Sequence, residues 1–324
     1  MTRAALLMTP ALAPLVFDAE AQRRLQAAVG VDAARAVAAL DDLTPDERAA
    51  IDLLITGWGV PPIGAADLDR LPALRAVVHW GGGVGFLDPS ASGRVAVSSA
   101  RAANAVPVAE FTLAMIALAL KDAFWVSRRY GLEQREVDRE AELAHTGAFE
   151  ATVGIVGASS VGSLVAEHLA ASDLRVLAFD PYLDPARARA LGVEPVHDLT
   201  EIARRSRVLT VHAPETPQTR GMVSREVLAA MPDGATLINT ARGSLVDQDA
   251  LVDELRTGRI RAILDVTEPE VLPAGHPLYG LPNVFLTPHL AGSTGNELRR
   301  LGRAAVAEVE RYAAGSPFAH PFPL

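Results

Sequence analysis

Three ionisable side chains in the second half of the chain each follow a run of Val, Ile and Leu residues. They are Arg242, Glu270 and His289. An arginine presents a planar fork of donors that suits a carboxylate or a polarised carbonyl. A histidine gives and takes a proton near neutral pH, and a glutamate beside it favours the charged ring and orients it. Together these residue types suit proton transfer next to a bound carboxylate.

A glycine-containing turn in the middle of the chain is suited to binding phosphate. A strand expected at 153–156 runs into Gly157-Ala-Ser159-Ser-Val-Gly162, and a helix is expected at 161–169. The free amides and the dipole at such a helix start attract a pyrophosphate. Strand, turn and helix in this order are the setting of a dinucleotide fingerprint, although Ser159 replaces its middle glycine. We expect the serine to fit and its hydroxyl to reach a phosphate.

Asp180 ends the next expected strand, eighteen residues after Gly162. A carboxylate at this position accepts hydrogen bonds from the ribose hydroxyls of adenosine and repels a 2′-phosphate. Pro181 and Tyr182, which follow it, add no positive charge. The sequence therefore favours NAD over NADP as the cofactor.

Strand and helix signals alternate along the chain in two series, separated by a long apolar helix (104–124) and a polar connector (127–143). Alternation of this kind predicts parallel sheets with helices on both faces. The expected strands are 4–8, 52–56, 74–80, 95–98, 153–156, 175–179, 208–211, 236–239, 260–266 and 284–286. The other expected helices are 18–28, one starting at Thr44-Pro45, 161–169, 199–204, 224–231, 249–255 and 297–313.

The fold class that these elements predict is α/β, with two Rossmann-like doubly wound parallel-sheet domains and a crevice between them. We expect an NAD-binding domain at 100–290 and a substrate domain built from 1–99 plus 291–324. In a doubly wound sheet the carboxyl ends of the strands face the ligand. Arg242, Glu270 and His289 are therefore expected to converge there.

Composition argues against several other kinds of partner. The net charge of -9 and the lack of a dense basic patch disfavour nucleic acid. The chain has no cysteine, and no cluster of ligands predicts a metal site. No apolar run of about 18 uncharged residues predicts a membrane span. Because Pro10 and Pro14 break the signal-like N-terminus, we expect a cytoplasmic protein.

In this order and spacing, the motifs resemble those of the D-isomer specific 2-hydroxyacid dehydrogenase family. The resemblance covers nearly the whole chain. The matching segments are 81–88 (GGGVGFLD), 104–110 (NAVPVAE), the turn at 154–162, 212–214 (HAP), 239–243 (NTARG), 265–273 (DVTEPEVLP) and 287–289 (TPH). It implies an oxidoreductase that transfers a hydride between NAD(H) and a small 2-oxo or 2-hydroxy acid, similar to glyoxylate and hydroxypyruvate reductases. It also implies a homodimer that pairs through the apolar helix after Asn104.

The resemblance assigns catalysis to Arg242, Glu270 and His289. The backbone of Gly82, Gly83 and Val84 would hold the substrate carboxylate, with Asn104 and Arg242 facing the substrate. Asp265 would hold the nicotinamide carboxamide. The residues expected to bind the cofactor are Gly157, Ser159, Ser160, Val161, Gly162, Asp180, Pro181, His212, Ala213, Pro214, Thr219, Thr240, Ala241, Arg242, Asp265, His289 and Gly292.

Two details of the site stay open. Glu268 is a second carboxylate close to Glu270, and Val271 stands where the family usually has proline. The segment at Gly85-Phe86 lacks the polar residues common in that loop, so glyoxylate, hydroxypyruvate and larger branched 2-oxo acids all remain candidate substrates. The remaining histidines are interpreted as structural; they are His79, His145, His168, His197, His276 and His320.

Two other functions are weighed against the dehydrogenase. Some proteins of this fold act as NAD-sensing interaction proteins rather than as metabolic enzymes, and the presence of Arg242, Glu270 and His289 favours the enzyme. A formate dehydrogenase would suit Asn104 and Arg242. It fits poorly with a histidine partnered by a glutamate, because formate oxidation needs no proton transfer to an alkoxide.

Overall fold

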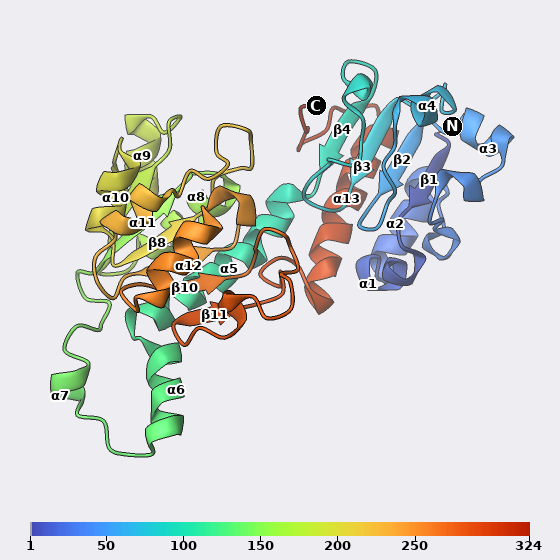
Figure 1. The fold of residues 1–324 in the computed structure, drawn as a ribbon. Coiled ribbons are helices and arrows are strands. Elements are labelled where there is room, and N and C mark those ends of the chain that lie inside the picture. The colour runs from blue at the N-terminus through green and yellow to red at the C-terminus, as the bar shows by residue number, and fades with distance from the viewer. Residues whose placement is uncertain (1) are drawn as a thin grey trace. The chain divides into compact units, whose positions relative to one another are not determined.

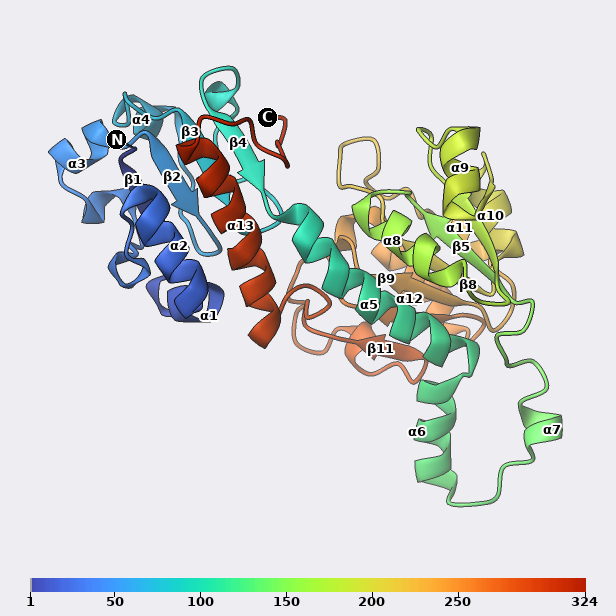
Figure 2. The same cartoon turned by 180° about the vertical axis from the view of Figure 1, so that it is seen from behind.

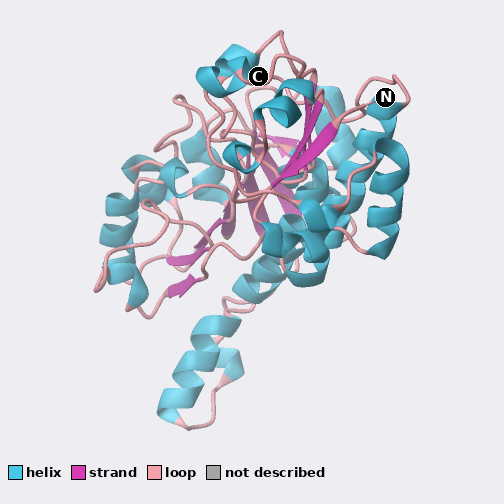
Figure 3. Cartoon of the chain, turned by 90° about the vertical axis from the view of Figure 1, so that its right-hand side faces the viewer, coloured by secondary structure: helices cyan, strands magenta, loops and turns pink. Residues whose placement is uncertain are grey.

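The computed structural model describes residues 2–324, which form two compact units. Unit 1 contains the residues up to Ala105 together with Ser293–Leu324, and unit 2 contains Val106–Gly292. Figure 1 labels most of the helices and many of the strands of both units, and Figure 3 shows their strands flanked by helices. All strand pairs in the two sheets are parallel among the described residues, which confirms the predicted α/β class.

Unit 1 is built on a four-stranded parallel sheet in the order β1-β2-β3-β4. The strands are β1 (Ala4–Leu7), β2 (Leu53–Thr56), β3 (Ala76–His79) and β4 (Ala96–Ser99). Successive side chains point to opposite faces, so Leu53 and Ile55 join one buried cluster while Leu54 joins another. The first cluster lies under α1 (Ala13–Val16), α2 (Ala19–Val29) and α13 (Leu298–Ala313), and the second under α4 (Ala65–Asp69).

The helix ends of unit 1 follow the signals in the sequence. Asp18 accepts a hydrogen bond from the amide of Ala21 and begins α2, and Gly30 ends it with a left-handed φ of 68°. Thr44 forms a capping box with Glu47 and begins α3 (Pro45–Ala50). These local contacts fix where each helix begins, and so fix the direction from which the chain enters the next strand.

Unit 2 is built on a seven-stranded parallel sheet in the order β11-β10-β9-β8-β5-β6-β7. The strands are β5 (Thr152–Val156), β6 (Arg175–Phe179), β7 (Glu194–Pro195), β8 (Val208–Val211), β9 (Thr236–Asn239), β10 (Arg261–Leu264) and β11 (Val284–Leu286). The order reverses where β5 lies between β6 and β8. In sheets of this kind a ligand binds at that reversal, beyond the carboxyl ends of the strands.

Helices cover both faces of the unit 2 sheet. One face packs against α10 (Leu199–Arg205), α11 (Arg225–Ala230) and α12 (Gln248–Arg256). The other packs against the second half of α5 (Arg101–Leu120), α8 (Ser160–Leu169) and α9 (Pro185–Leu191). Apart from one methionine in each, the buried residues of both clusters are Val, Ile, Leu and Ala, as expected for parallel strands that are buried on both faces.

The long helix α5 differs from the prediction of 104–124 in its bounds. It begins at Arg101 and ends at Leu120, with Pro107 inside it. By length and composition it could cross a membrane, yet half of its apolar window is buried inside the protein. Glu110 lies within it, so it is not the uncharged apolar run that would predict a membrane span. Since Ala109, Ile116 and Leu120 belong to the core of unit 2, α5 is a core helix of this fold.

An arm follows α5 and consists of α6 (Ala123–Glu133) and α7 (Arg139–Glu142). Figure 2 shows it extending away from the sheet of unit 2. Asp122, at its base, has a left-handed φ of 52° that separates α5 from α6. Its buried carboxylate accepts hydrogen bonds from Arg261 at 2.8 Å and Arg207 at 3.3 Å, and lies 2.8 Å from the His145 ring. The arm is therefore anchored at its base to residues that precede β8 and begin β10.

Candidate active site

The three predicted catalytic residues lie at one edge of the unit 2 sheet. Arg242 follows β9, Glu270 follows β10 and His289 follows β11. These strands are neighbours in the sheet, and their last residues align in register as Asn239, Leu264 and Leu286. The structure thus brings the three loops together at the carboxyl ends of adjacent strands.

His289 and Glu270 form a direct pair. The Nδ1 atom of His289 lies 2.5 Å from Oε1 of Glu270, and both side chains are partly exposed. Glu268, the alternative partner, instead lies 3.7 Å from Arg220. With Nδ1 engaged by the carboxylate, Nε2 is the ring nitrogen left to exchange a proton.

The loop that carries Glu270 is held by its own hydrogen bonds. The Thr267 hydroxyl donates to the carbonyls of Pro269 at 2.8 Å and Glu270 at 3.1 Å. The Gln248 side chain bonds both the amide and the carbonyl of Glu268. These contacts fix the path of the backbone, so the Glu270 carboxylate is presented to His289 from a defined position.

His289 itself has a left-handed backbone conformation, with φ of 53°. Asp265 supports it from the end of β10: its carbonyl accepts the His289 amide at 2.9 Å. Its carboxylate, only 1% exposed, accepts hydrogen bonds from Thr287 Oγ1 at 2.6 Å and from the amides of Leu290 and Ala291 at 2.8 and 2.9 Å. Asp265, the residue expected to hold the carboxamide, is thus mainly engaged with the His289 loop. Its Oδ2 accepts one of these bonds and can accept a second donor.

Arg242 lies on a turn fixed by Asn239. The Asn239 side chain accepts the Ala241 amide at 3.0 Å and donates to the Arg242 carbonyl at 2.8 Å. The exposed guanidinium donates one bond, from Nη1 to the Ala241 carbonyl at 2.6 Å. Gly243 has no side chain, and this lets the loop that carries Glu270 approach. A Cβ at this position would lie only 2.1 Å from the Thr267 carbonyl carbon. The Arg242 turn and the Glu270 loop are therefore packed directly against each other.

The glycine-containing turn after β5 forms the predicted cradle. Gly157 has φ of 96°, and a Cβ on it would lie 2.5 Å from the Ala213 amide. A Cβ on Gly162 would lie 2.0 Å from the Gly157 carbonyl oxygen. Neither position admits a side chain, which is the close backbone approach that a pyrophosphate site requires.

The hydroxyl of Ser159 makes two hydrogen bonds within the protein. The hydroxyl donates to the His212 carbonyl at 2.7 Å and caps α8 by accepting the Gly162 amide at 3.5 Å. The oxygen thus satisfies one of the free amides of its own helix, and a bond from Ser159 to a phosphate stays a prediction. Its cap fixes the start of α8, where Ser160 and Val161 are the first residues.

A pocket of about 650 Å³ opens beside this turn. It is lined by Gly157, Ala158, Ser159, Ser160, Phe179, Asp180, Pro181, Tyr182, Arg187, Leu199, Ala213, Pro214, Thr216, Gln218, Thr219 and Met222. The Asp180 carboxylate accepts the amides of Ala158 and Tyr182, both at 2.8 Å, which fixes it beside the turn. Pro181, Ala213 and Pro214 in this lining were predicted, whereas Phe179, Leu199, Met222 and Arg187 were not. That arginine donates to the Ala158 carbonyl at 2.6 Å, so it supports the turn from a helix that the sequence analysis did not predict.

Two other predicted cofactor residues turn their side chains inward. His212 is buried with its Nε2 2.9 Å from Thr210 Oγ1, and burial lowers its pKa to about 3, so the ring is neutral. Thr240 is buried and its hydroxyl lies 3.1 Å from that of Thr112 on α5. Neither side chain lines the pocket beside the glycine-containing turn, to which Ala213 and Pro214 belong. A place for His212 and Thr240 in the cofactor site stays a prediction. Gly292 lies at the end of unit 2.

The predicted substrate loop belongs to unit 1 and follows β3. Ser99 donates its hydroxyl to the Gly82 carbonyl at 2.8 Å, and Asn104 Nδ2 lies 3.7 Å from where a Cβ on Gly82 would be. Gly83 is exposed and Val84 is buried. Asn104 accepts the Ser293 amide at 3.1 Å, so its oxygen is already engaged. The exposed turn at Gly83 is thus flanked by Gly82, Val84 and Asn104.

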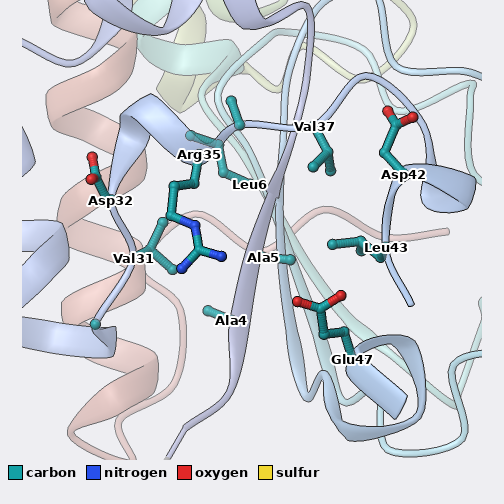
Figure 4. A pocket seen from close by; sticks show the side chains of 12 residues that line it. Ala4, Ala5, Leu6, Val31, Asp32, Arg35, Val37, Asp42, Leu43 and Glu47 are labelled. Atoms are coloured by element: carbon teal, nitrogen blue, oxygen red, sulfur yellow. The ribbon is translucent and has the colours of Figure 1, made fainter. Parts of the chain in front are cut away.

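A second hollow of about 440 Å³ lies in unit 1 beside β1 and is shown in Figure 4. Arg35, Asp42 and Glu47 line it together with Ala4, Leu6 and other apolar residues. Both carboxylates already accept backbone amides of their own turns. None of the predicted site residues lines this hollow, so it is separate from the chemistry described above.

Comparisons with known proteins bear on the family. Residues 113–291 match the family model for "D-isomer specific 2-hydroxyacid dehydrogenase, NAD binding domain". The chain is 36% identical over 261 residues to D-3-phosphoglycerate dehydrogenase of Mycobacterium leprae, covering 79% of this chain and 48% of that protein. It is 31% identical over 251 residues to D-3-phosphoglycerate dehydrogenase of Methanocaldococcus jannaschii, covering 76% and 47%. The chain thus spans about half the length of the curated relatives that it matches.

Solved structures agree over nearly the whole chain. A D-isomer specific 2-hydroxyacid dehydrogenase from Xanthobacter autotrophicus Py2, in complex with NADPH and MES, is 28% identical with a TM-score of 0.75 and covers 98% of this chain and 97% of that chain. D-mandelate dehydrogenase of Rhodotorula graminis, at 24% identity, shares the fold with a TM-score of 0.80 and covers 99% and 97%. The family predicted from the motifs is confirmed. This chain belongs to the D-isomer specific 2-hydroxyacid dehydrogenases and carries their NAD-binding domain.

Proposed function

We propose that this chain is an NAD-dependent dehydrogenase that interconverts a small 2-oxo acid and the corresponding D-2-hydroxy acid. The observation that carries the proposal is the His289–Glu270 pair, which lies at the same sheet edge as Arg242. A proton donor and a carboxylate-binding cation at one edge are what reduction of a 2-oxo acid requires. The bound cofactor supplies or accepts the hydride.

His289 would act as the acid in reduction and as the base in oxidation. As negative charge develops on the carbonyl oxygen, Nε2 donates its proton to that oxygen, and in the reverse direction it removes the hydroxyl proton. Glu270 stabilises the positive ring through Nδ1 and holds it in one orientation. Arg242 would bind the substrate carboxylate and polarise the carbonyl with its free donors.

The remaining predicted residues would bind cofactor and substrate. The turn Gly157–Gly162, with Pro214 and Thr219 across the pocket, would hold the pyrophosphate, and the fixed Asp180 carboxylate would accept the adenosine ribose hydroxyls. Asp180 would also repel a 2′-phosphate, which favours NAD. The remaining acceptor on Asp265, with Ala241 nearby, would hold the carboxamide. Gly82 and Gly83 would offer amides to the substrate carboxylate, with unit 1 as the substrate domain and unit 2 as the NAD-binding domain.

We further propose a homodimer in the cytoplasm. The arm exposes large apolar side chains at Tyr130 and Leu132 on α6, and at Phe149 near its return to the sheet. Exposed apolar residues gathered on one projecting element are typical of an interface that is covered in the assembled protein. These residues extend the surface of α5, the helix expected to pair with its copy.

The test is the oxidation of NADH in the presence of a panel of 2-oxo acids, with the His289→Ala protein alongside. Loss of a general acid lowers the rate by roughly 10²–10⁴-fold, so the variant should lose most of its turnover. Glu268→Gln is the matched control, because this carboxylate lies beside Arg220 rather than His289. Its rate should stay close to that of the parent chain.

Turnover of an acid that is lost in His289→Ala and kept in Glu268→Gln would establish the dehydrogenase. Equal loss in both variants would contradict the assignment of Glu270 as the partner of the histidine. Binding of NADH with no turnover of any acid would overturn the proposal and favour a protein that senses NAD and acts through a partner.

A further inference from the structure

Arg187 lies in the first turn of α9 and lines the pocket beside the glycine-containing turn. It is the only basic residue among the described residues of this lining. Its Nη2 atom donates to the Ala158 carbonyl at 2.6 Å and to Ser163 Oγ at 2.9 Å. The Ser163 hydroxyl, on α8, donates to the same carbonyl at 3.1 Å. Side chains from two helices thus converge on one carbonyl of the turn.

The backbone of Ala158 is therefore held at both of its polar groups. Its amide donates to the Asp180 carboxylate at 2.8 Å, and its carbonyl accepts from Arg187 and Ser163. Ala158 is buried. Because the peptide unit is planar and rigid, fixing the Ala158 carbonyl also fixes the amide of Ser159, the residue that begins α8.

The start of α8 presents free amides whose direction depends on Ser159. The Ser159 carbonyl accepts the Ser163 amide at 2.9 Å, and its hydroxyl caps the Gly162 amide. The amides of Ser160 and Val161, in the first turn, have no acceptor within the helix. Amides of this kind bind phosphate at the start of a helix. A displaced Ala158 carbonyl would therefore turn these two donors away from a bound phosphate.

The helix that carries Arg187 is itself fixed in place. Asp184 caps α9 by accepting the amides of Ala186 and Arg187, both at 2.8 Å. Ala188 and Leu191 of α9 are buried in the same apolar cluster as Val165 of α8. The base of the Arg187 side chain is thus held against the helix whose start it contacts.

The bonds of Nη2 favour a role in orienting the turn over direct contact with a ligand. Both protons of Nη2 are used, one on Ala158 and one on Ser163. Ser163 shares the Ala158 carbonyl with Arg187, yet it does not belong to the described lining of the pocket. This set of contacts therefore serves the backbone of the turn rather than a molecule in the pocket.

We propose that Arg187 is a positioning residue of the cofactor site. Through the Ala158 carbonyl it orients the start of α8, so that the amides of Ser160 and Val161 face the pyrophosphate. The inference rests on the proposed function, which places the pyrophosphate at this turn. Asp180 and Arg187 act from opposite sides of one residue: the carboxylate holds the Ala158 amide, and the guanidinium holds its carbonyl.

The experiment measures dissociation constants of the full chain for NADH by its fluorescence, with ADP and adenosine as competing ligands. Arg187→Ala should weaken the binding of NADH and of ADP by about tenfold, the size expected for one hydrogen bond to a charged group. Adenosine has no phosphate, so its affinity should stay close to the parent value. In turnover, KM for NADH should rise while kcat changes little.

Ser163→Ala separates orientation from charge. This variant keeps the guanidinium but removes one donor to the Ala158 carbonyl and one acceptor of Nη2. It should weaken NADH and ADP in the same direction, by about threefold. Arg187→Lys keeps a charged donor and should recover part of the loss. Arg189→Ala is the matched control, because Arg189 is an exposed residue of the same helix outside the described lining; its affinities should match those of the parent chain.

Thermal unfolding without ligand checks that each variant is folded. Unchanged NADH binding in a folded Arg187→Ala protein would overturn the positioning role. A loss in Arg187→Ala with none in Ser163→Ala would also overturn it, because the guanidinium would then act on the ligand by its charge alone. Equal losses for ADP and adenosine would overturn the link to the pyrophosphate. A parent chain that binds neither NADH nor ADP would instead overturn the placement of the cofactor in the proposed function.

Discussion

The backbone of His289 occupies the left-handed region, which costs a residue with a side chain roughly 1–2 kcal/mol. Asp265 offsets this cost by accepting three hydrogen bonds with its carboxylate and one with its carbonyl, all from residues 287–291. The ionised Asp265 carboxylate only accepts hydrogen bonds, so it suits a site where three donors surround it. We therefore regard Asp265 as a positioning residue for the imidazole as well as a candidate cofactor ligand.

Asp265→Asn should show this positioning role. The NH2 group of the asparagine would face at least one of the three donors that the carboxylate now accepts. That donor would be left unpaired, which should lower the free energy of unfolding by about 1–3 kcal/mol. Turnover should fall about tenfold or more, because small misplacements of a catalytic group are costly. Urea unfolding and NADH kinetics measure the two effects.

The matched control is Asp247→Asn, which weakens the cap of α12 in the same unit. It should change stability by less than about 1 kcal/mol and leave turnover unaffected. If Asp265→Asn lost stability but kept full turnover, the positioning role would be wrong.

Some residue roles could be predicted and others could not. The placement of Arg242, Glu270 and His289 at one edge could be predicted because the strand ends of a parallel sheet meet there, whatever the details of the loops. The hydrogen bonds of the Ser159 hydroxyl and the His212 ring could not, since the sequence does not display their partners.

At the scale of elements, the arm depends on one buried carboxylate. Asp122 lies between α5 and α6 and is the shared acceptor of Arg207 and Arg261, each about one-fifth exposed. Removing a buried partner leaves charges without compensation. The bonds from Arg207 and Arg261 to Asp122 therefore fix the position at which α6 and α7 leave the sheet.

Asp122→Ala should accordingly lower the free energy of unfolding by about 3 kcal/mol, since the two arginines lose their partner. Glu150→Gln is the control: its pair with Arg175 spans 3.5 Å between largely exposed side chains and should contribute about 0–1 kcal/mol. Thermal or urea unfolding distinguishes them. Similar small effects in both variants would show that the arm is held elsewhere.

The element bounds were predicted well where the local signals are strong. β6, β8, β9 and β11 match their expected ranges, because short apolar runs are bounded by polar residues. α9 and β7 were missed: the Asp184-Pro185 start was not recognised, and β7 has only two residues and contains a proline. The start of α5 was placed three residues late, because Arg101 to Ala103 do not distinguish a helix from a loop.

At the scale of the whole molecule, the proposed dimer would cover the exposed apolar residues of the arm. Leu132 and Tyr130 are exposed apolar side chains of the arm, with exposed fractions of 78% and 59%. A monomer would leave them in water with no gain. Covering them in a second copy would remove that apolar area from solvent.

Leu132→Glu should therefore shift the chain from dimer toward monomer, because a charge at the centre of an apolar contact must be desolvated. Sedimentation velocity over a range of concentrations measures the shift. Tyr182→Ala, a change at another exposed aromatic residue on the cofactor pocket, should leave the mass unchanged. A parent chain that sediments as a monomer throughout would rule out the dimer.

The division of the chain has a consequence for its synthesis. Unit 2 is continuous in sequence, whereas unit 1 is completed by α13 and by the segment in which Phe322 donates to the Val97 carbonyl and His320 accepts from Ser98. A ribosome makes β1 to β4 first, with α1 and α2, but delivers α13, the third helix on the same face, last. The apolar face of the first sheet must therefore wait, without α13, while the whole of unit 2 is made and folds. Chaperone demand should peak during that interval, and unit 2 should become resistant to protease on the nascent chain before unit 1 does.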